Sequence, residues 1–472
     1  MNPDRLGAID ATYLAIEDAR TPLHVASIGI FEKGNLCDQD GGIRLDEVRA
    51  RISARLDLLP RLRQRVVDVP FGINRPVWID DEHFDVANHV EAMGLPAPHD
   101  EAALIALAED LVMQPLPRDR PLWHVWFVTG LAGDRVALIE RAHHAMVDGV
   151  SGVDVSLVLL DTSPDAPAER AATWQPRPSP SLSDLLLSGL ADRVTVPTEA
   201  AGRAAAAALT RPLDVARGVG RFAGALGALR REGVRAPVSS LNREVGGRRH
   251  LAFVRQRLED VRAAGAPVGA TVNDVVLTAV AGGLRELFLG RGEPLPADLR
   301  LKVLVPVSVR ATEESMALGN RVGGLVVPLP VGIGDPHERL LAVTAMTKTL
   351  KRSNEAAAAD LLLQAADLLP PSIVGLLQRG VHHQPVVNLV VTNIPGPNFP
   401  LYAMGGRMLE AFPVVPLAGN MPLEVAVLSY DGALNMCVTS DATTCPDAAA
   451  FVRGVEHGFE LLGARWTPAL SS

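Results

Sequence analysis

Apolar residues recur with two different spacings along the first half of the chain, and these spacings predict alternating strands and helices. Continuous or alternating apolar runs are typical of strands, whereas apolar residues spaced by three or four indicate an amphipathic helix. The predicted strands cover residues 24–31, 123–131 and 135–142, and the last two are joined by a turn at 132–134. Two helices are marked by Val48, Ile52, Leu56 and Leu59, before Pro60, and by Leu104, Leu107 and Leu111, before Pro115.

A second half with the same mixture of periods begins near Arg248. Its long apolar helix is expected over 272–289, and a second helix opens at Asp335 and Pro336, a capping residue followed by proline at the first helical position. A third helix is expected from Pro446. The predicted strands cover residues 251–258, 299–310, 321–330, 386–393 and 423–441, the last broken by the Asp431-Gly432 turn.

The mixture of strands and helices predicts an α/β protein with mixed sheets. A length of 472 residues exceeds what one hydrophobic core usually organises, so two similar domains are expected. We divide the chain into an N-terminal half (1–180), an Ala/Arg-rich helical linker (181–245) and a C-terminal half (246–472). A cleft between the halves is the expected place for a site.

Composition excludes several classes of function. The net charge of −9 argues against a nucleic-acid-binding protein. The 3 cysteines form no CxxC pair, which argues against a zinc site, and we expect no bound metal. The N-terminus lacks the pattern of a signal peptide and no apolar run reaches membrane-spanning length, so a cytoplasmic protein is expected.

The strongest chemical signal is a histidine pair, His143 and His144, that directly follows the expected strand 135–142 and precedes Asp148 and Gly149. A neutral imidazole at the end of a rigid strand is suited to act as a general base near neutral pH. A carboxylate just beyond it can hold the loop and orient the ring, and glycine permits a sharp turn. The pattern predicts a catalytic base; the alternative is a pair of hydrogen-bonded core histidines beside a turn.

Three residues of the second half are candidates to complete the site. Asn273 stands at the start of the long helix, where an amide donor and the helix dipole suit a developing oxyanion, although asparagine is also common in turns. Asp274 lies three residues after Thr271 and is interpreted as a structural capping-box residue. Arg310 leaves the strand 299–310 and is either a surface residue or an ion-pair partner of Asp148 that locks the histidine loop.

The sequence lacks the common motifs of a protein nucleophile or a phosphate-binding loop: there is no GxSxG, no GxxxxGK[ST] and no GxGxxG after a strand. A base without a partner nucleophile indicates that it activates a hydroxyl or amine of a substrate directly.

These segments resemble a known family. The HHxxxDG pattern at 143–149 resembles that of CoA-dependent acyltransferases and of peptide-synthetase condensation domains. Further segments, in order along nearly the whole chain, are similar to the bacterial wax ester synthase/acyl-CoA:diacylglycerol acyltransferase family. They are residues 10–14 (DATYL), 21–24 (TPLH), 121–123 (PLW), 273–277 (NDVVL), 306–310 (PVSVR) and 392–397 (TNIPGP).

The resemblance implies a two-domain acyltransferase fold with an active-site tunnel between the halves. It assigns His144 as the catalytic base, His143 as a supporting residue and Asp148 as a structural one. The implied reaction moves a long-chain acyl group from acyl-CoA, a co-substrate, to diacylglycerol or a long-chain alcohol, with no other cofactor. The alternatives are a condensation-type acyltransferase with another acceptor and a lipid-binding homologue without turnover.

The linker contains an apolar stripe that the resemblance does not explain. Val215, Val219, Phe222, Leu226 and Leu229 fall on one face of a helix, and Arg217, Arg221 and Arg231 fall on the opposite face. A basic amphipathic helix of this kind can lie at a membrane or lipid-droplet surface. The alternative is that the stripe packs against one of the two halves.

Overall fold

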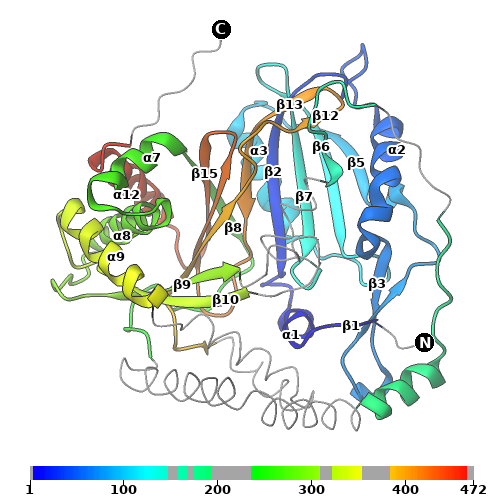
Figure 1. Ribbon diagram of the computed structural model, residues 1–472, viewed down its shortest axis with the longest axis horizontal. Helices are drawn as coiled ribbons and strands as arrows, with labels where there is room; N and C mark the ends of the chain where they lie inside the picture. Colours follow the sequence, from blue (N-terminus) through cyan, green and yellow to red (C-terminus); the bar gives the residue numbers. More distant parts are fainter. Residues whose placement is uncertain are drawn as a thin grey trace, which may run out of the picture.

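The computed structural model describes residues 4–146, 158–167, 174–192, 235–308, 322–352 and 383–464. Its described part is built around two six-stranded sheets that lie side by side, with helices on the outer side of each and one helix, α3 (Glu101–Met113), between them (Figure 1). The first sheet has the strand order β12-β13-β2-β7-β6-β5. Its strands are β2 (His24–Glu32), β5 (Val90–Gly94), β6 (Trp123–Leu131), β7 (Arg135–His143), β12 (Tyr402–Ala403) and β13 (Gly406–Val414).

The first sheet has two apolar faces, because successive apolar residues of its strands point to opposite sides. Val125 and Phe127 of β6 join one core with Val48 and Ile52 of α2 (Leu45–Arg55). Trp126 and Val128, the alternate residues of β6, join another core with α3 (Glu101–Met113). Successive strand residues point to opposite faces, so one strand contributes to both cores.

The second sheet has the order β10-β9-β11-β14-β15-β8, in which β11 runs parallel to both of its neighbours and the remaining pairs are antiparallel. Its outer helices are α7 (Leu258–Gly265), α8 (Val272–Gly290), α9 (Pro336–Arg352) and α12 (Ala448–Leu461), on the left in Figure 1. Its strands are β8 (Arg249–Arg257), β9 (Leu301–Ser308), β10 (Val322–Leu329), β11 (Leu389–Pro395), β14 (Leu423–Tyr430) and β15 (Ala433–Asp441).

Helices α8 and α12 approach each other closely through glycines. A Cβ atom added at Gly283 of α8 would lie 2.6 Å from Cγ2 of Val455 and 2.7 Å from the carbonyl oxygen of Phe451. A Cβ atom at Gly454 would lie 2.7 Å from Cβ of Glu286. Only residues without a side chain permit this separation, and the contact buries the apolar face of α8 in the centre of the second half.

A small third sheet completes the first half. It consists of β1 (Asp4–Arg5), β4 (Val77–Asp80) and β3 (Gln64–Val67), and a helix over residues 182–192 packs Leu185 against it. Helix α1 (Ala8–Ile16) lies between this sheet and the second half at the bottom of Figure 1. The short 3-10 helices are η1 (Leu56–Leu58), η2 (Pro60–Arg63), η3 (Pro70–Gly72), η4 (Val86–Asn88) and η5 (Ala266–Val268).

The strand β13 joins the two halves. It follows β11 in the chain but pairs antiparallel with β2 of the first sheet, from Met408 opposite Phe31 to Val414 opposite Ala26. The ring of Phe412 of β13 stacks on that of Phe253 of β8 with centroids 3.9 Å apart. Arg255 of β8 forms ion pairs with both Glu101 of α3 and Glu410 of β13.

The α/β class, the mixed sheets and most of the predicted elements are confirmed, with ends that differ by a few residues. The strand β13 is not among the predicted elements. Among the described residues, no single helix is long and apolar enough to cross a membrane. One bent pair, residues 258–268 and 272–290 with an angle of 94° between them, has the length and composition of a membrane span when its two parts are taken together.

Candidate active site

The end of β7 holds the histidine pair through the backbone. The strand pairs antiparallel with β2 on one side and β6 on the other. The amide of His143 donates to the carbonyl of Leu122 (2.9 Å), and the amide of His144 donates to the carbonyl of Leu23 (2.8 Å). The pair is therefore fixed between the segments that lead into β6 and β2, which is the rigid position that the sequence predicted.

The His144 side chain is partly buried and lies against α1. Its ring stacks on that of Tyr13, with centroids 4.3 Å apart and planes 21° apart. Tyr13 belongs to the segment 10–14 that carried the family resemblance, although no role for it was predicted from the sequence. The stacking restricts the orientation of an imidazole that is suited to proton transfer.

The His143 side chain is fully buried and closes the turn that carries His144. Its Nδ1 atom accepts a hydrogen bond from the amide of Ala145 (3.0 Å). An Nδ1 atom that accepts a hydrogen bond carries no proton, so the neutral ring holds its proton on Nε2. Burial lowers the pKa of His143 to about 4, against an opposing effect of Glu17. A supporting role for His143 agrees with this geometry.

Several predicted features lie outside the described residues. They are Asp148, Gly149, Arg310 and the linker stripe between Val215 and Arg231. The Asp148–Arg310 ion pair and the placement of the stripe therefore stay predictions.

Asp274 forms the predicted capping box at the start of α8. Its Oδ2 accepts hydrogen bonds from the amide and the hydroxyl of Thr271, both at 2.8 Å, while the Thr271 hydroxyl accepts from the amide of Asp274 (3.3 Å). Its Oδ1 accepts a further hydrogen bond from the hydroxyl of Thr347 (2.7 Å). The structural interpretation of Asp274 is confirmed.

Asn273 lies beside another segment that carried the resemblance. Its Oδ1 accepts a hydrogen bond from Nδ2 of Asn393 (3.4 Å), which belongs to β11. The two asparagines come from segments 273–277 and 392–397, far apart in sequence, and meet through the packing of α8 on the second sheet. Bonded in this way, Asn273 keeps its own amide group as a donor.

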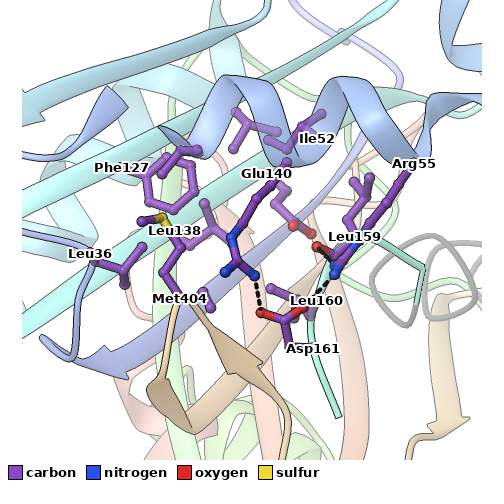
Figure 2. A pocket seen from close by; sticks show the side chains of 14 residues that line it. Leu36, Ile52, Arg55, Phe127, Leu138, Glu140, Leu159, Leu160, Asp161 and Met404 are labelled. Carbon is purple, nitrogen blue, oxygen red and sulfur yellow. Dashed lines mark hydrogen bonds and ion pairs between the residues drawn. The ribbon is translucent and has the colours of Figure 1, made fainter. Parts of the chain in front are cut away.

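An apolar cavity lies between α2 and the first sheet (Figure 2). At one side, the carboxylate of Asp161 forms ion pairs with Arg55 and with Arg51 (3.1 Å to Nη1). Leu138 and Glu140 of β7 contribute from the strand that ends at the histidine pair. The other lining residues are Leu36, Val48, Ile52, Val125, Phe127, Leu159, Leu160, Ala403 and Met404.

Most residues that line the cavity belong to the N-terminal half, and Ala403 and Met404 come from the C-terminal half. A tunnel between the two halves stays a prediction. In the described part of the chain, no group of three or more His, Cys, Asp or Glu side chains is arranged to hold a metal ion.

Comparisons with known proteins agree with this architecture. The wax ester synthase/diacylglycerol acyltransferase catalytic domain matches residues 6–276, and the C-terminal domain of the same family matches residues 318–463. The probable diacylglycerol O-acyltransferase tgs1 of Mycobacterium tuberculosis is 32% identical over 469 residues, which cover 98% of this chain and 96% of the relative.

Solved structures share the fold. The wax ester synthase/diacylglycerol acyltransferase from Marinobacter aquaeolei VT8 superposes with a TM-score of 0.67 at 23% identity, covering 97% of this chain and 98% of that one. The starter condensation domain of rhizomide synthetase, solved with C8-CoA and Leu-SNAC, has a TM-score of 0.62 at 14% identity, covering 100% and 97%. At these identities the likeness establishes the fold. With both of its domains matched, the chain belongs to the wax ester synthase/diacylglycerol acyltransferase family and is an acyltransferase.

Proposed function

We propose that the protein transfers a long-chain acyl group from acyl-CoA to the free hydroxyl of diacylglycerol, which forms triacylglycerol, and that long-chain alcohols are a second class of acceptor. The observation that carries the proposal is the placement of His144. Its backbone is fixed between strands and its ring is oriented by Tyr13, in a chain that matches both domains of the family.

The chemistry is a direct transfer between two bound substrates. His144 takes the proton of the acceptor hydroxyl as that oxygen attacks the thioester carbonyl carbon. The tetrahedral intermediate then collapses, the carbon–sulfur bond breaks, and the protonated imidazole returns its proton to the CoA thiolate. Alignment of the two substrates and exclusion of water lower the barrier and suppress hydrolysis of the thioester. This route requires acyl-CoA and no further cofactor.

Asn273 is the proposed donor to the oxyanion of the intermediate. Its amide group stands at the N-terminus of α8, where the helix dipole also favours negative charge. The contact with Asn393 supports the role, because it engages the Oδ1 atom and orients the side chain. Substitution of Asn273 should therefore affect turnover more than stability.

The apolar cavity is the proposed place for part of the acyl chain. Along β7, Glu140 and His143 are separated by about 10 Å of strand, a distance that a long acyl chain can span. The lining is mostly aliphatic, which suits hydrocarbon, while the Asp161 ion pairs bound the cavity at one side.

We also propose that the protein is cytoplasmic and binds peripherally to a membrane or lipid-droplet surface, where its acceptor is dissolved. Support comes from four exposed apolar side chains, Phe71, Leu182, Leu187 and Leu190, of which Phe71 is 91% exposed and Leu187 67%. Phe71 lies in the turn between Val69 and Ile73, and both of these flanking residues pack beside Gly189 of the helix over 182–192. Exposed apolar side chains on neighbouring segments are typical of a surface that contacts lipid or protein.

One experiment tests the activity. Purified protein is incubated with radiolabelled palmitoyl-CoA and, separately, with dioleoylglycerol, hexadecanol or an aminoacyl thioester, and the labelled products are separated. The proposal predicts labelled triacylglycerol, and wax ester with the alcohol. Label in an amide only would favour a condensation-type enzyme, whose domains share the fold. Absence of transfer to every acceptor would favour a lipid-binding protein.

Flotation of vesicles tests the lipid surface. The double variant Phe71→Asp/Leu187→Asp is compared with the parent on phosphatidylcholine vesicles that contain diacylglycerol. Val238→Asp, which introduces the same charge at a fully exposed apolar residue elsewhere, is the control. We expect the parent and the control to float and the double variant to stay in solution. Equal flotation of all three proteins would show that Phe71 and Leu187 are not part of the lipid-binding surface.

A further inference from the structure

We propose that Glu17 is a positioning residue of the transfer site, which holds His143 in the tautomer whose Nδ1 atom fixes the turn carrying His144. The inference rests on the proposed function, in which His144 is the base. Glu17 follows α1 directly and is not among the site residues predicted from the sequence.

The carboxylate of Glu17 lies between two buried histidines. Its Oε1 atom is 3.1 Å from Nε2 of His24 and 3.5 Å from Nε2 of His143, and it accepts a hydrogen bond from the amide of Leu23 (3.2 Å). Its Oε2 atom pairs with Arg118. The two imidazoles are 1% and 0% exposed and the Glu17 side chain 14%, so the cluster is shielded from bulk water.

The pairing of β2 with β7 explains why one carboxylate reaches both rings. His24, the first residue of β2, stands directly opposite His143, the last residue of β7. The two rings meet edge to face with centroids 5.9 Å apart. Glu17 and Tyr13 lie at the same end of α1, and the amide of Glu17 donates to the Tyr13 carbonyl (3.2 Å). One end of α1 therefore contacts both histidines of the pair: Tyr13 contacts His144, and Glu17 contacts His143.

The position of the His143 proton connects Glu17 to the turn. Because Nδ1 accepts from the amide of Ala145, the ring proton must be on Nε2, which faces Glu17. The other tautomer would place an N–H group against the Ala145 amide and a lone pair against the carboxylate. Glu17 disfavours that tautomer electrostatically, as a carboxylate does for a histidine that it orients.

The charges around Glu17 keep it ionised. Burial raises its pKa, but the contacts with His143 and His24 outweigh that effect and hold the pKa well below its ordinary value. Two cations also face the cluster: Arg118 pairs with Glu17, and Arg141 interacts electrostatically with both Glu17 and His24. The carboxylate therefore stays negative across the pH range in which the enzyme is expected to work.

The variant Glu17→Gln tests the role, because it removes the charge and keeps the shape. We expect kcat to fall about 10- to 10²-fold with little change in KM, as is typical when the partner that orients a functional histidine is removed. Glu109→Gln is the matched control: Glu109 is similarly buried, accepts a backbone hydrogen bond from Leu251 and pairs with His250, which is not one of the histidines at the site. The control should keep the parental kcat.

Two further measurements separate positioning from general stability. In a double-mutant cycle on kcat, Glu17→Gln should have little further effect once His143→Asn is present, because the carboxylate acts through His143. In ¹⁵N-histidine NMR spectra of the parent, His143, assigned by its loss in His143→Asn, should have the Nε2–H pattern, and Glu17→Gln should weaken it. This readout does not depend on turnover, so it remains informative if the transfer assay fails.

The proposal is overturned by an Nδ1–H pattern for His143 in the parent, by a folded Glu17→Gln variant with parental kcat, or by additive effects in the cycle. An Nδ1–H pattern in the parental spectrum overturns the proposal even if Glu17→Gln does not fold.

Discussion

The ring of Tyr13 stacks on the ring of His144, with centroids 4.3 Å apart and planes inclined by 21°. The contact joins α1 to the end of β7. It holds the proposed base through its side chain, in addition to the backbone hydrogen bonds that fix the strand end. Stacked aromatic pairs contribute about 0.5–1.5 kcal/mol beyond the area they bury. Loss of the contact should therefore affect the orientation of His144 more than the stability of the fold.

Substitution of Tyr13 tests this contact. We expect Tyr13→Leu to lower kcat several-fold. Without the stacked ring, the imidazole also adopts orientations in which it cannot take the proton of the substrate hydroxyl. Tyr13→Phe keeps the stacked ring and should retain most of the activity. Steady-state kinetics with acyl-CoA and diacylglycerol measure both variants, and a Tyr13→Leu variant as active as the parent would show that the stacking has no part in turnover.

Burial of His143 predicts a pH-dependent stability. Its folded-state pKa of about 4 lies below the ordinary 6.5, so between these values the unfolded chain binds more protons than the folded one. The contribution of neutral, buried His143 to the free energy of unfolding is therefore fully present above pH 6.5, and it is lost as the pH falls towards 4. His143→Asn, whose Oδ1 can still accept from Ala145, should show a smaller decline in unfolding free energy between pH 7 and pH 4.5. Urea unfolding at both values measures the difference; equal declines would contradict the assignment.

Asn273 and Thr271, two residues apart, should respond in opposite ways to substitution. Thr271→Ala removes a capping residue of α8 and should cost about 1 kcal/mol of unfolding free energy, with turnover largely kept. Asn273→Ala should leave stability nearly unchanged and lower kcat about 10²-fold, the typical effect of losing one oxyanion donor. Urea unfolding and kinetics on both variants provide the comparison. An Asn273→Ala variant with parental kcat would remove this residue from the mechanism.

The cavity predicts control of acyl-chain length. Leu138→Phe adds volume to a lining position and should shift the preference towards shorter acyl-CoA substrates. Leu138→Met keeps the volume and serves as the control. Competition between acyl-CoA substrates of different length, read by mass spectrometry of the products, measures the preference. An unchanged distribution in a folded Leu138→Phe variant would place the acyl chain elsewhere.

Local patterns were sufficient to predict most helices and strands, the capping box of Asp274 and the strand-end position of the histidine pair. The strand β13 was missed because Arg407, Glu410 and Pro413 interrupt its apolar pattern. Its pairing with β2 also depends on a contact between segments about 380 residues apart, which no local period encodes.

Glu17 was missed for a related reason. A lone glutamate after a helix is usually a solvated residue, and its importance arises only when the register of β2 and β7 places His24 opposite His143. That register is a property of the folded sheet. The sequence signal was indirect: His24 stands in the segment 21–24 that carried the family resemblance.

The central claim, that His144 is the base of the transfer, is tested most directly by His144→Ala. The variant is incubated with radiolabelled palmitoyl-CoA and dioleoylglycerol, and its fold is checked by circular dichroism and thermal unfolding. The account predicts a folded protein whose rate of triacylglycerol formation is lower by about 10²-fold or more, as expected when a general base is removed. A folded His144→Ala protein that forms triacylglycerol at nearly the parental rate would contradict it.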